Sequence, residues 1–224
     1  MSTVMSPDSV AEALEMVRAG LGYLAAADAA QLPAEIQAEC LRGLERTDAI
    51  STAARASFLS VFTSGQGYSA DADYSPRAWL IHQTRVSKAA AVAHTAWARR
   101  ATTHPQVVAA LAAGELSESI GRTICGWTDK LPEDCRPAAD AILLSAAKAG
   151  MDLRDLAGLA AEMYERSRRD LPDEDPARGF GDRGVRLATT FQGAGVLNGD
   201  LTPRVRRRRH RGAGRAVRAG RGRG

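Results

Sequence analysis

The chain has 224 residues, of which 45% are apolar, so it is long enough to bury a hydrophobic core. No apolar run reaches the roughly 18 residues of a membrane span, and residues 1–30 lack the pattern of a signal peptide, which favours a cytoplasmic protein without a membrane partner. The net charge of +4 is unevenly divided, because residues 1–203 hold 20 Lys and Arg against 26 Asp and Glu, whereas residues 204–224 hold ten Arg and no acid.

Alanine and leucine at helical spacing predict a mainly α-helical, bundle-like domain with helical hairpins over residues 1–169. We expect a first helix from the Ser6-Pro7 pair to about residue 30 and a second from Pro33 to Ser64, which together form a hairpin. The residues expected to face inward are Val10, Leu14, Val17, Leu21 and Leu24 on the first helix, and Ile36, Cys40, Leu44, Phe58, Leu59 and Phe62 on the second.

Six shorter helices are predicted beyond residue 74. Their starts and ends are marked by Ser75-Pro76, a break over residues 84–87, His104-Pro105, Gly114, Ser117, Pro132, Gly150 and Asp152. In the helix that begins near Pro132, we expect Ile142 to face inward. Trp79, Trp97 and Trp127 each fall on an apolar helical face, which favours core anchors over base-stacking platforms.

The pattern changes after residue 169. Residues 170–184 form an acidic, Pro- and Gly-rich linker that we expect to stay loose. Residues 185–203 contain two short alternating stretches, VRLATTF and VLNGDL, which predict a β-hairpin remnant. Thr202-Pro203 then predicts the start of a helix. The Arg- and Gly-rich residues 204–224 follow instead, and they are predicted to be disordered.

No catalytic, cofactor or metal motif is found. His82, His94, His104 and His210 have no second His or Cys at metal-ligand spacing, and Cys40, Cys125 and Cys135 contain no C-x-x-C pair. We therefore assign no catalytic, cofactor-binding or metal-binding residue, and the chain is not predicted to be an enzyme.

One basic window interrupts the acidic body. Residues 74–114 contain Arg77, Arg85, Lys88, Arg99 and Arg100 and no acid. Within it, WLIHQTRVSKAAAVAHTAW is typical of a helix-turn-helix, in which basic side chains after the turn meet phosphates. The fit is imperfect, because Ile81 stands where a small residue is usual, Arg85 where glycine is usual and His94 where an apolar residue is usual. The open alternative is a solvated face on a packed pair of helices.

Several stretches in order carry a resemblance to a known family. LRGLERTDAISTAARASFLSVF, GYSADADYSPRAWLIHQTRVSKAAA, AALAAGELSES, MDLRDLAGLAAEM and TTFQGAGVLNGDLTP resemble the actinobacterial domain of unknown function 222, also called the mycobacterial 13E12 repeat family. The resemblance covers roughly residues 35–203. It implies a C-terminal HNH endonuclease module in a complete relative, but after Pro203 this chain offers only His210 within an arginine run, and no residue matches a catalytic motif.

The basic tail has two interpretations. Arginine codons of GC-rich genes, read one base later, encode Ala-, Val- and Gly-rich sequence, which would supply the helix announced by Thr202-Pro203. We therefore hypothesise that residues 204–224 are an out-of-frame reading, from a frameshifted or miscalled C-terminus. The alternative is a genuine Arg/Gly arm whose Arg204, Arg206, Arg207, Arg208 and Arg209 bind nucleic acid.

The expected function is a non-catalytic helical accessory region of an HNH-endonuclease-type family. In this interpretation the basic window contacts DNA through Arg77, Arg85, Lys88, Arg99 and Arg100. The alternative is a protein-interaction or oligomerisation module without DNA binding, in which helical faces associate with a second copy of the chain.

Overall fold

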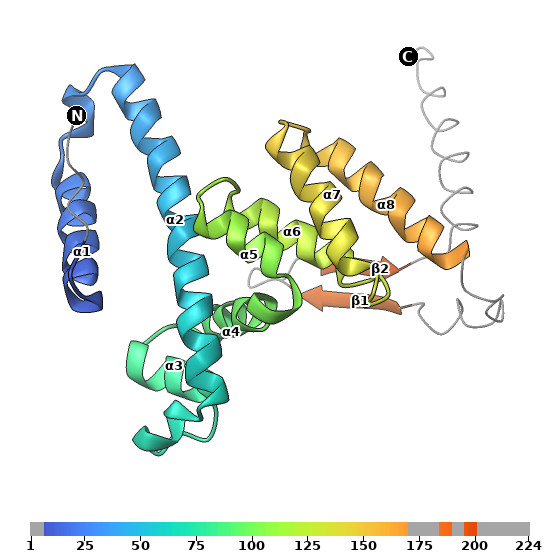
Figure 1. Cartoon of the computed structure of the whole chain (residues 1–224), viewed down its shortest axis with the longest axis horizontal. Coiled ribbons are helices and arrows are strands. Elements are labelled where there is room, and N and C mark those ends of the chain that lie inside the picture. Colours follow the sequence, from blue (N-terminus) through green and yellow to red (C-terminus); the bar gives the residue numbers. More distant parts are fainter. Residues whose placement is uncertain (1–6, 170–183, 190–194, 201–224) are drawn as a thin grey trace, which may run out of the picture. The chain divides into compact units, whose positions relative to one another are not determined.

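The structure is a computed structural model that describes residues 7–169, 184–189 and 195–200. Its described part is mainly α-helical, which confirms the predicted fold class at that level (Figure 1). The α-helices are α1 (Val10–Ala26), α2 (Ala34–Ser64), α3 (Pro76–Thr84), α4 (Lys88–Thr103), α5 (Pro105–Ala112), α6 (Glu118–Thr128), α7 (Arg136–Lys148) and α8 (Leu153–Arg169). Short 3-10 turns at Ala29–Gln31 and Gly67–Asp71 follow α1 and α2.

The chain divides into two compact units, residues 1–164 and residues 165–224. In the second unit, β1 (Gly184–Thr189) and β2 (Gly195–Asp200) pair antiparallel, with Leu187 opposite Leu197. The linker at 170–183, the connection at 190–194 and the tail at 201–224 lie outside the described residues. The hairpin remnant, the loose linker and the disordered tail therefore stay predictions.

Serine residues set the start of four helices. Ser75, Ser87 and Ser117 each accept a hydrogen bond from the backbone N–H three residues later, at the first turns of α3, α4 and α6. The prediction for α1 was wrong by three residues, because Ser9 and not Ser6 is its cap: the Ser9 hydroxyl accepts from Glu12 N at 3.1 Å. α1 also ends at Ala26 and not near residue 30, since the Asp28 carboxylate caps the 3-10 turn that follows.

The main core is formed by residues of α2 and of α4 to α8. Its largest fully buried side chains include Leu111, Ile124, Leu143 and Leu156. α2 contributes small residues, Ala49, Ala53 and Ala56, which let the neighbouring helices approach its backbone closely. Trp97 is buried in this core, and Trp127 packs against it, as the sequence predicts.

A smaller core joins the C-terminal end of α2 to α3 and α4. Leu59, Leu80, Ala91 and Ala98 are its buried members. Phe62 and Trp79 pack on it with ring centroids 4.6 Å apart, and the Trp79 indole N–H donates to Asp71 Oδ2 at 2.6 Å. This second core fixes the turn between α3 and α4.

The prediction of an inward-facing α1 was wrong. Val10, Leu14, Val17, Leu21 and Leu24 are all exposed, by 40 to 62%, and α1 has no buried residue. Ile36, Phe58 and Ile142, also expected inward, are exposed as well. Helical periodicity identifies an apolar face but does not show which neighbour covers it. Among the described residues, every helix is too short or too polar to cross a membrane.

The turn between α3 and α4 contains a left-handed residue, Arg85, with φ of 58°. This is the position at which the sequence pattern of a helix-turn-helix has glycine, the residue that adopts this conformation most readily. A non-glycine residue pays about 1–2 kcal/mol to adopt this conformation.

We expect Arg85→Gly to be more stable than Arg85→Ala by about 1 kcal/mol, because glycine enters the left-handed region without a Cβ clash. In a helix interior, by contrast, the alanine variant would be the more stable of the two. Urea unfolding of both variants measures the difference. A more stable alanine variant would show that the left-handed turn is not maintained in solution.

Candidate functional site

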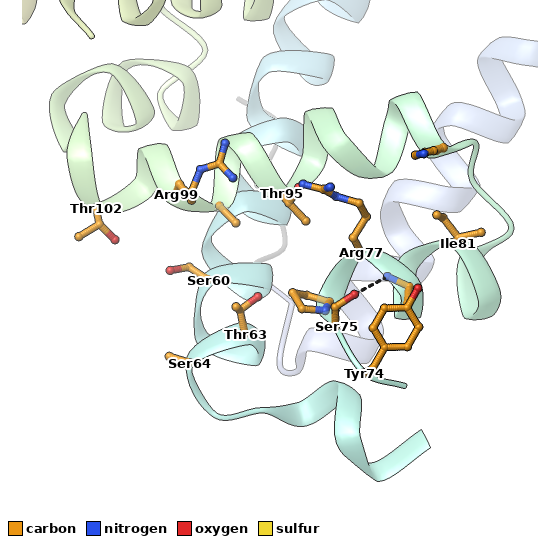
Figure 2. Close-up of a pocket in the computed structure, with 14 residues that line it drawn as sticks. Ser60, Thr63, Ser64, Tyr74, Ser75, Arg77, Ile81, Thr95, Arg99 and Thr102 are labelled. Carbon is orange, nitrogen blue, oxygen red and sulfur yellow. Dashed lines mark hydrogen bonds between the residues drawn. The ribbon is translucent and has the colours of Figure 1, made fainter. Parts of the chain in front are cut away.

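Three of the predicted basic residues line one pocket. Arg77 at the start of α3 and Lys88 and Arg99 on α4 surround a cavity of about 670 Å³ that the C-terminal end of α2 closes (Figure 2). Lys88 and Arg99 are eleven residues apart, about three helical turns, so they lie on the same face of α4. We call this cavity the basic pocket.

The three cations of the basic pocket are free to meet a ligand. Arg77, Lys88 and Arg99 are exposed and form no ion pair with any described residue, and no acid lines the pocket. The last acidic residue before Arg77 in the sequence is Asp73. It is buried, and its Oδ1 lies 2.7 Å from Nδ1 of His82. The pocket is therefore positive and is not neutralised by its own wall.

Hydroxyl groups complete the wall. Ser60 and Thr63 on α2 and Thr102 on α4 line the basic pocket, and their side chains donate no hydrogen bond to any described residue. The N-terminus of α3 also opens on this side, with Ser75 capping it through the N–H of Ala78 at 3.1 Å. Hydroxyls, free cations and the positive end of a helix dipole are groups that bind phosphate oxygens.

The other two predicted basic residues lie apart from the basic pocket. Arg85 is exposed in the turn just before α4 and does not line the pocket. Arg100 lies on a different side of α4, about 100° around the helix from Arg99, where its guanidinium lies 5.0 Å from the centre of the Trp97 ring and 3.9 Å from Asp129 Oδ2. Its contacts are internal, so it supports the fold. Arg204, Arg206, Arg207, Arg208 and Arg209 lie outside the described residues.

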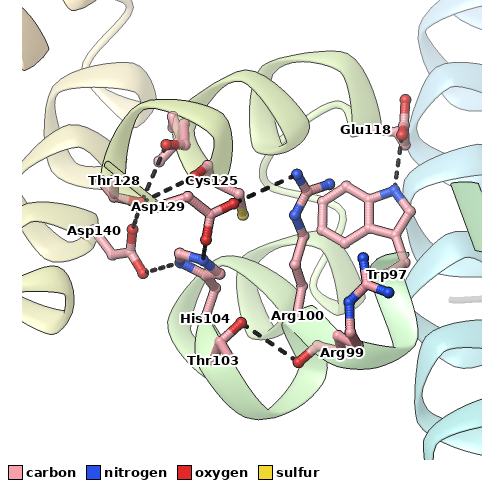
Figure 3. Close-up of polar contacts among 11 residues, drawn as sticks. Trp97, Arg99, Arg100, Thr103, His104, Glu118, Cys125, Thr128, Asp129 and Asp140 are labelled. Carbon is pink, nitrogen blue, oxygen red and sulfur yellow. Dashed lines mark hydrogen bonds and ion pairs between the residues drawn. The ribbon is translucent and has the colours of Figure 1, made fainter. Parts of the chain in front are cut away.

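A buried polar network lies next to Arg100 (Figure 3). His104, at the corner between α4 and α5, is fully buried, and both of its ring nitrogens face carboxylates. Nδ1 lies 2.8 Å from Asp140 Oδ2 and Nε2 lies 3.0 Å from Asp129 Oδ1. The Thr128 hydroxyl donates to the other oxygen of Asp140 at 2.8 Å. The network thus joins the α4–α5 corner to α6 and α7.

The two carboxylates set the charge of His104. Burial alone would lower its pKa, but the hydrogen bonds to Asp140 and Asp129 and their negative charges raise the pKa above the ordinary 6.5. In its protonated form the ring is an imidazolium that can donate from both nitrogens, to Asp140 and to Asp129. Both ring nitrogens are engaged and no atom of the ring is exposed, so His104 links the α4–α5 corner to Asp129 and Asp140.

Burial changes the pKa of two other titratable side chains, Cys125 and His94. Burial raises the pKa of the Cys125 thiol to about 12, so the reactive thiolate is absent at neutral pH. His94 lies on the far side of the α3–α4 unit, in an apolar hollow lined by Phe58, Phe62 and Trp79, where burial and then Arg55 lower its pKa. Within the described residues, no group of three or more His, Cys, Asp or Glu could hold a metal ion.

Sequence reasoning found the cations of the basic pocket but missed two other parts of the site. The hydroxyls of α2 carry no local signal, because Ser60 and Thr63 look like ordinary surface residues. The His104 network joins residues 25 and 36 positions apart. One signal was present: Asp140 lies on the same helical face as Leu143 and Leu144, where a buried carboxylate requires a partner.

Comparison of the chain with protein families, with curated proteins and with solved structures finds no match.

Removing the His104 ring leaves the buried Asp140 carboxylate without this partner, whereas Asp129 is 48% exposed. We expect His104→Leu to lower the free energy of unfolding by about 3–5 kcal/mol, as for one partner of a buried ion pair. Urea unfolding measures the loss. His82→Gln is the control, because the His82 ring is 61% exposed and glutamine can still donate to the buried Asp73 carboxylate; we expect it to cost less than His104→Leu.

The raised pKa of His104 also predicts a pH dependence. Since the folded pKa lies above the unfolded value of about 6.5, the stability from this ionisation is fully present below pH 6.5 and is lost as pH rises through the folded pKa. Urea unfolding at a series of pH values should show this decline in the native chain. The decline should be absent in His104→Gln, and parallel profiles for the two proteins would contradict the assignment.

Proposed function

We propose that the basic pocket binds the phosphate backbone of duplex DNA. In this proposal the chain is a non-catalytic helical accessory region of the 13E12 repeat type, which positions DNA for a nuclease module of the HNH class. The observation that carries the proposal is the convergence of Arg77, Lys88 and Arg99 on one pocket whose wall has no acid. Arg100 is engaged within the fold and Arg85 lies outside the pocket, which leaves these three cations for a ligand.

Phosphate fits this pocket better than another anion class for geometric reasons. Arg77 and Arg99 present planar guanidinium groups that bond two phosphate oxygens at once, while Lys88 adds a point charge. Ser60 and Thr63 supply hydroxyl donors on the α2 side. A phosphodiester has two unesterified oxygens and accepts several donors from different directions, as this wall provides.

Contact with the backbone is supported more than reading of bases. α3 and α4 form a helix-turn-helix-like pair with Ser87 capping the second helix. In that motif the exposed residues near the start of the second helix reach base edges. Here those residues include Ala89 and Val92, which offer no hydrogen bond to a base. We therefore propose binding that is weakly dependent on sequence and strongly dependent on salt.

The proposal is tested with residues 1–203, because the arginines of the tail would bind nucleic acid by themselves. We expect this fragment to bind duplex DNA at low salt and to release it as salt rises. Arg77→Gln, Lys88→Gln and Arg99→Gln should each weaken binding and reduce the slope of log K against log salt by about 0.9 per lost phosphate contact. Fluorescence anisotropy at several salt concentrations measures both quantities.

Arg154→Gln is the matched control, because Arg154 is exposed on α8 and lies outside the basic pocket. It should leave affinity and slope unchanged. Absence of binding at low salt would reject the proposal and favour an interaction module without DNA. Binding that appears only with residues 204–224 present would assign nucleic-acid contact to the arm.

A further inference from the structure

α1 carries an uncovered heptad seam. Its apolar residues Val10, Leu14, Val17, Leu21 and Leu24 follow spacings of 4, 3, 4 and 3, which is the a/d repeat of a coiled coil. All five are exposed, by 40 to 62%. A strict repeat of this kind matches another helix with the same repeat, because each residue on the seam enters a hole between four residues of its partner.

The residues beside the seam permit contact between two identical helices. With Leu14 and Leu21 at a positions, the six flanking e and g positions are Ala11, Ala13, Arg18, Gly20, Ala25 and Ala27. Only Arg18 is charged, and it is paired with Glu15 at 3.0 Å on its own helix. Two copies therefore meet without rows of like charge, and the small flanking residues allow a close approach of the backbones.

The start of α2 offers more apolar surface beside α1. Ile36 is 42% exposed and Leu41 is 66% exposed, and an apolar hollow of about 480 Å³ lies between Leu24 of α1 and Leu41 and Leu44 of α2. α1 is about 25 Å long, so α1 and the first half of α2 present a face of about 500 Å². A standard interface buries about 800 Å² per partner, so an association of modest strength is expected.

An isolated helix of this length has little stability of its own. α1 has 17 residues, only slightly more than the length of about 12–15 residues below which isolated helices are marginal in water, and it contains Gly20 and Gly22, at each of which an added Cβ would meet nothing within 4 Å. α1 therefore gains its stability from whatever covers its seam, and the described part of the chain leaves the seam open.

From the heptad spacing, the uncharged flanks and the exposed start of α2, we propose that a second copy of this chain covers the seam. Two copies of α1 pack along their seams with two-fold symmetry, and the start of α2 in each copy adds apolar surface to the interface. Dimer formation and ordering of α1 are then one event.

The test uses the full chain, treated with nuclease and kept at high salt so that the basic tail does not bridge molecules. Sedimentation velocity from about 1 μM to about 1 mM should show a monomer–dimer equilibrium, as expected for a modest interface. Leu14→Glu and Leu21→Glu should each weaken dimerisation at least tenfold. Ala19→Glu, on the opposite face of α1, should leave it unchanged.

Amide hydrogen exchange of residues 10–26 is the second measurement. Protection of α1 should rise with protein concentration in the native chain and stay low in Leu14→Glu. Since α1 has no buried residue, neither variant should change the thermal unfolding of the rest of the helical unit. A monomer throughout, a dimer unaffected by both glutamates, or an α1 equally protected in the monomer would each overturn the proposal.

Discussion

The imidazolium of His104 between two carboxylates is the constraint on which the arrangement of the helices depends. His104 ends α4 and begins α5, Asp129 follows α6 and Asp140 lies in α7, so one buried ring fixes the contact of four helices. A hydrophobic contact could slide by part of a turn, but hydrogen bonds of 2.8 and 3.0 Å from opposite sides of a planar ring could not. The direction of α4 follows from this ring, and with it the position of Arg99 at the basic pocket.

Because the direction of α4 is fixed, two neighbouring arginines in this helix have different roles. Arg99 and Arg100 are adjacent in sequence and point to different sides of α4. Arg100 lies over Trp97, whose indole N–H donates to Glu118 at 2.8 Å, so its charge is used within the fold. Arg99 faces the basic pocket, where no acid meets it. The charge of the window as a whole is thus a poor measure of its capacity to bind an anion; which face each cation occupies is decisive.

The sequence predicted the helices well because their boundaries are local. Ser75, Ser117 and Gly114 act on the backbone within one turn, so their effect can be recognised without knowledge of the fold. It failed for α1, since a periodic apolar face looks the same whether it is covered or exposed. The sequence pattern identified the cations of the basic pocket, because they lie in an interval without acidic residues. It did not predict that Arg77 and Arg99 share a cavity with Ser60, because that depends on how α2 packs against α4.

α2 is one continuous helix of 31 residues, and along its length it contributes residues to three different regions of the structure. Ile36 lies on the exposed apolar face, Ala49 and Ala53 in the core, and Ser60 at the basic pocket. Each residue added or removed within a helix rotates everything beyond it by about 100°. A single insertion between Ile36 and Ala49 would turn the first surface to another side while leaving the other two in place. Related chains should therefore vary in length before Ala34 or in the loop after Ser64, and keep the length of α2 constant.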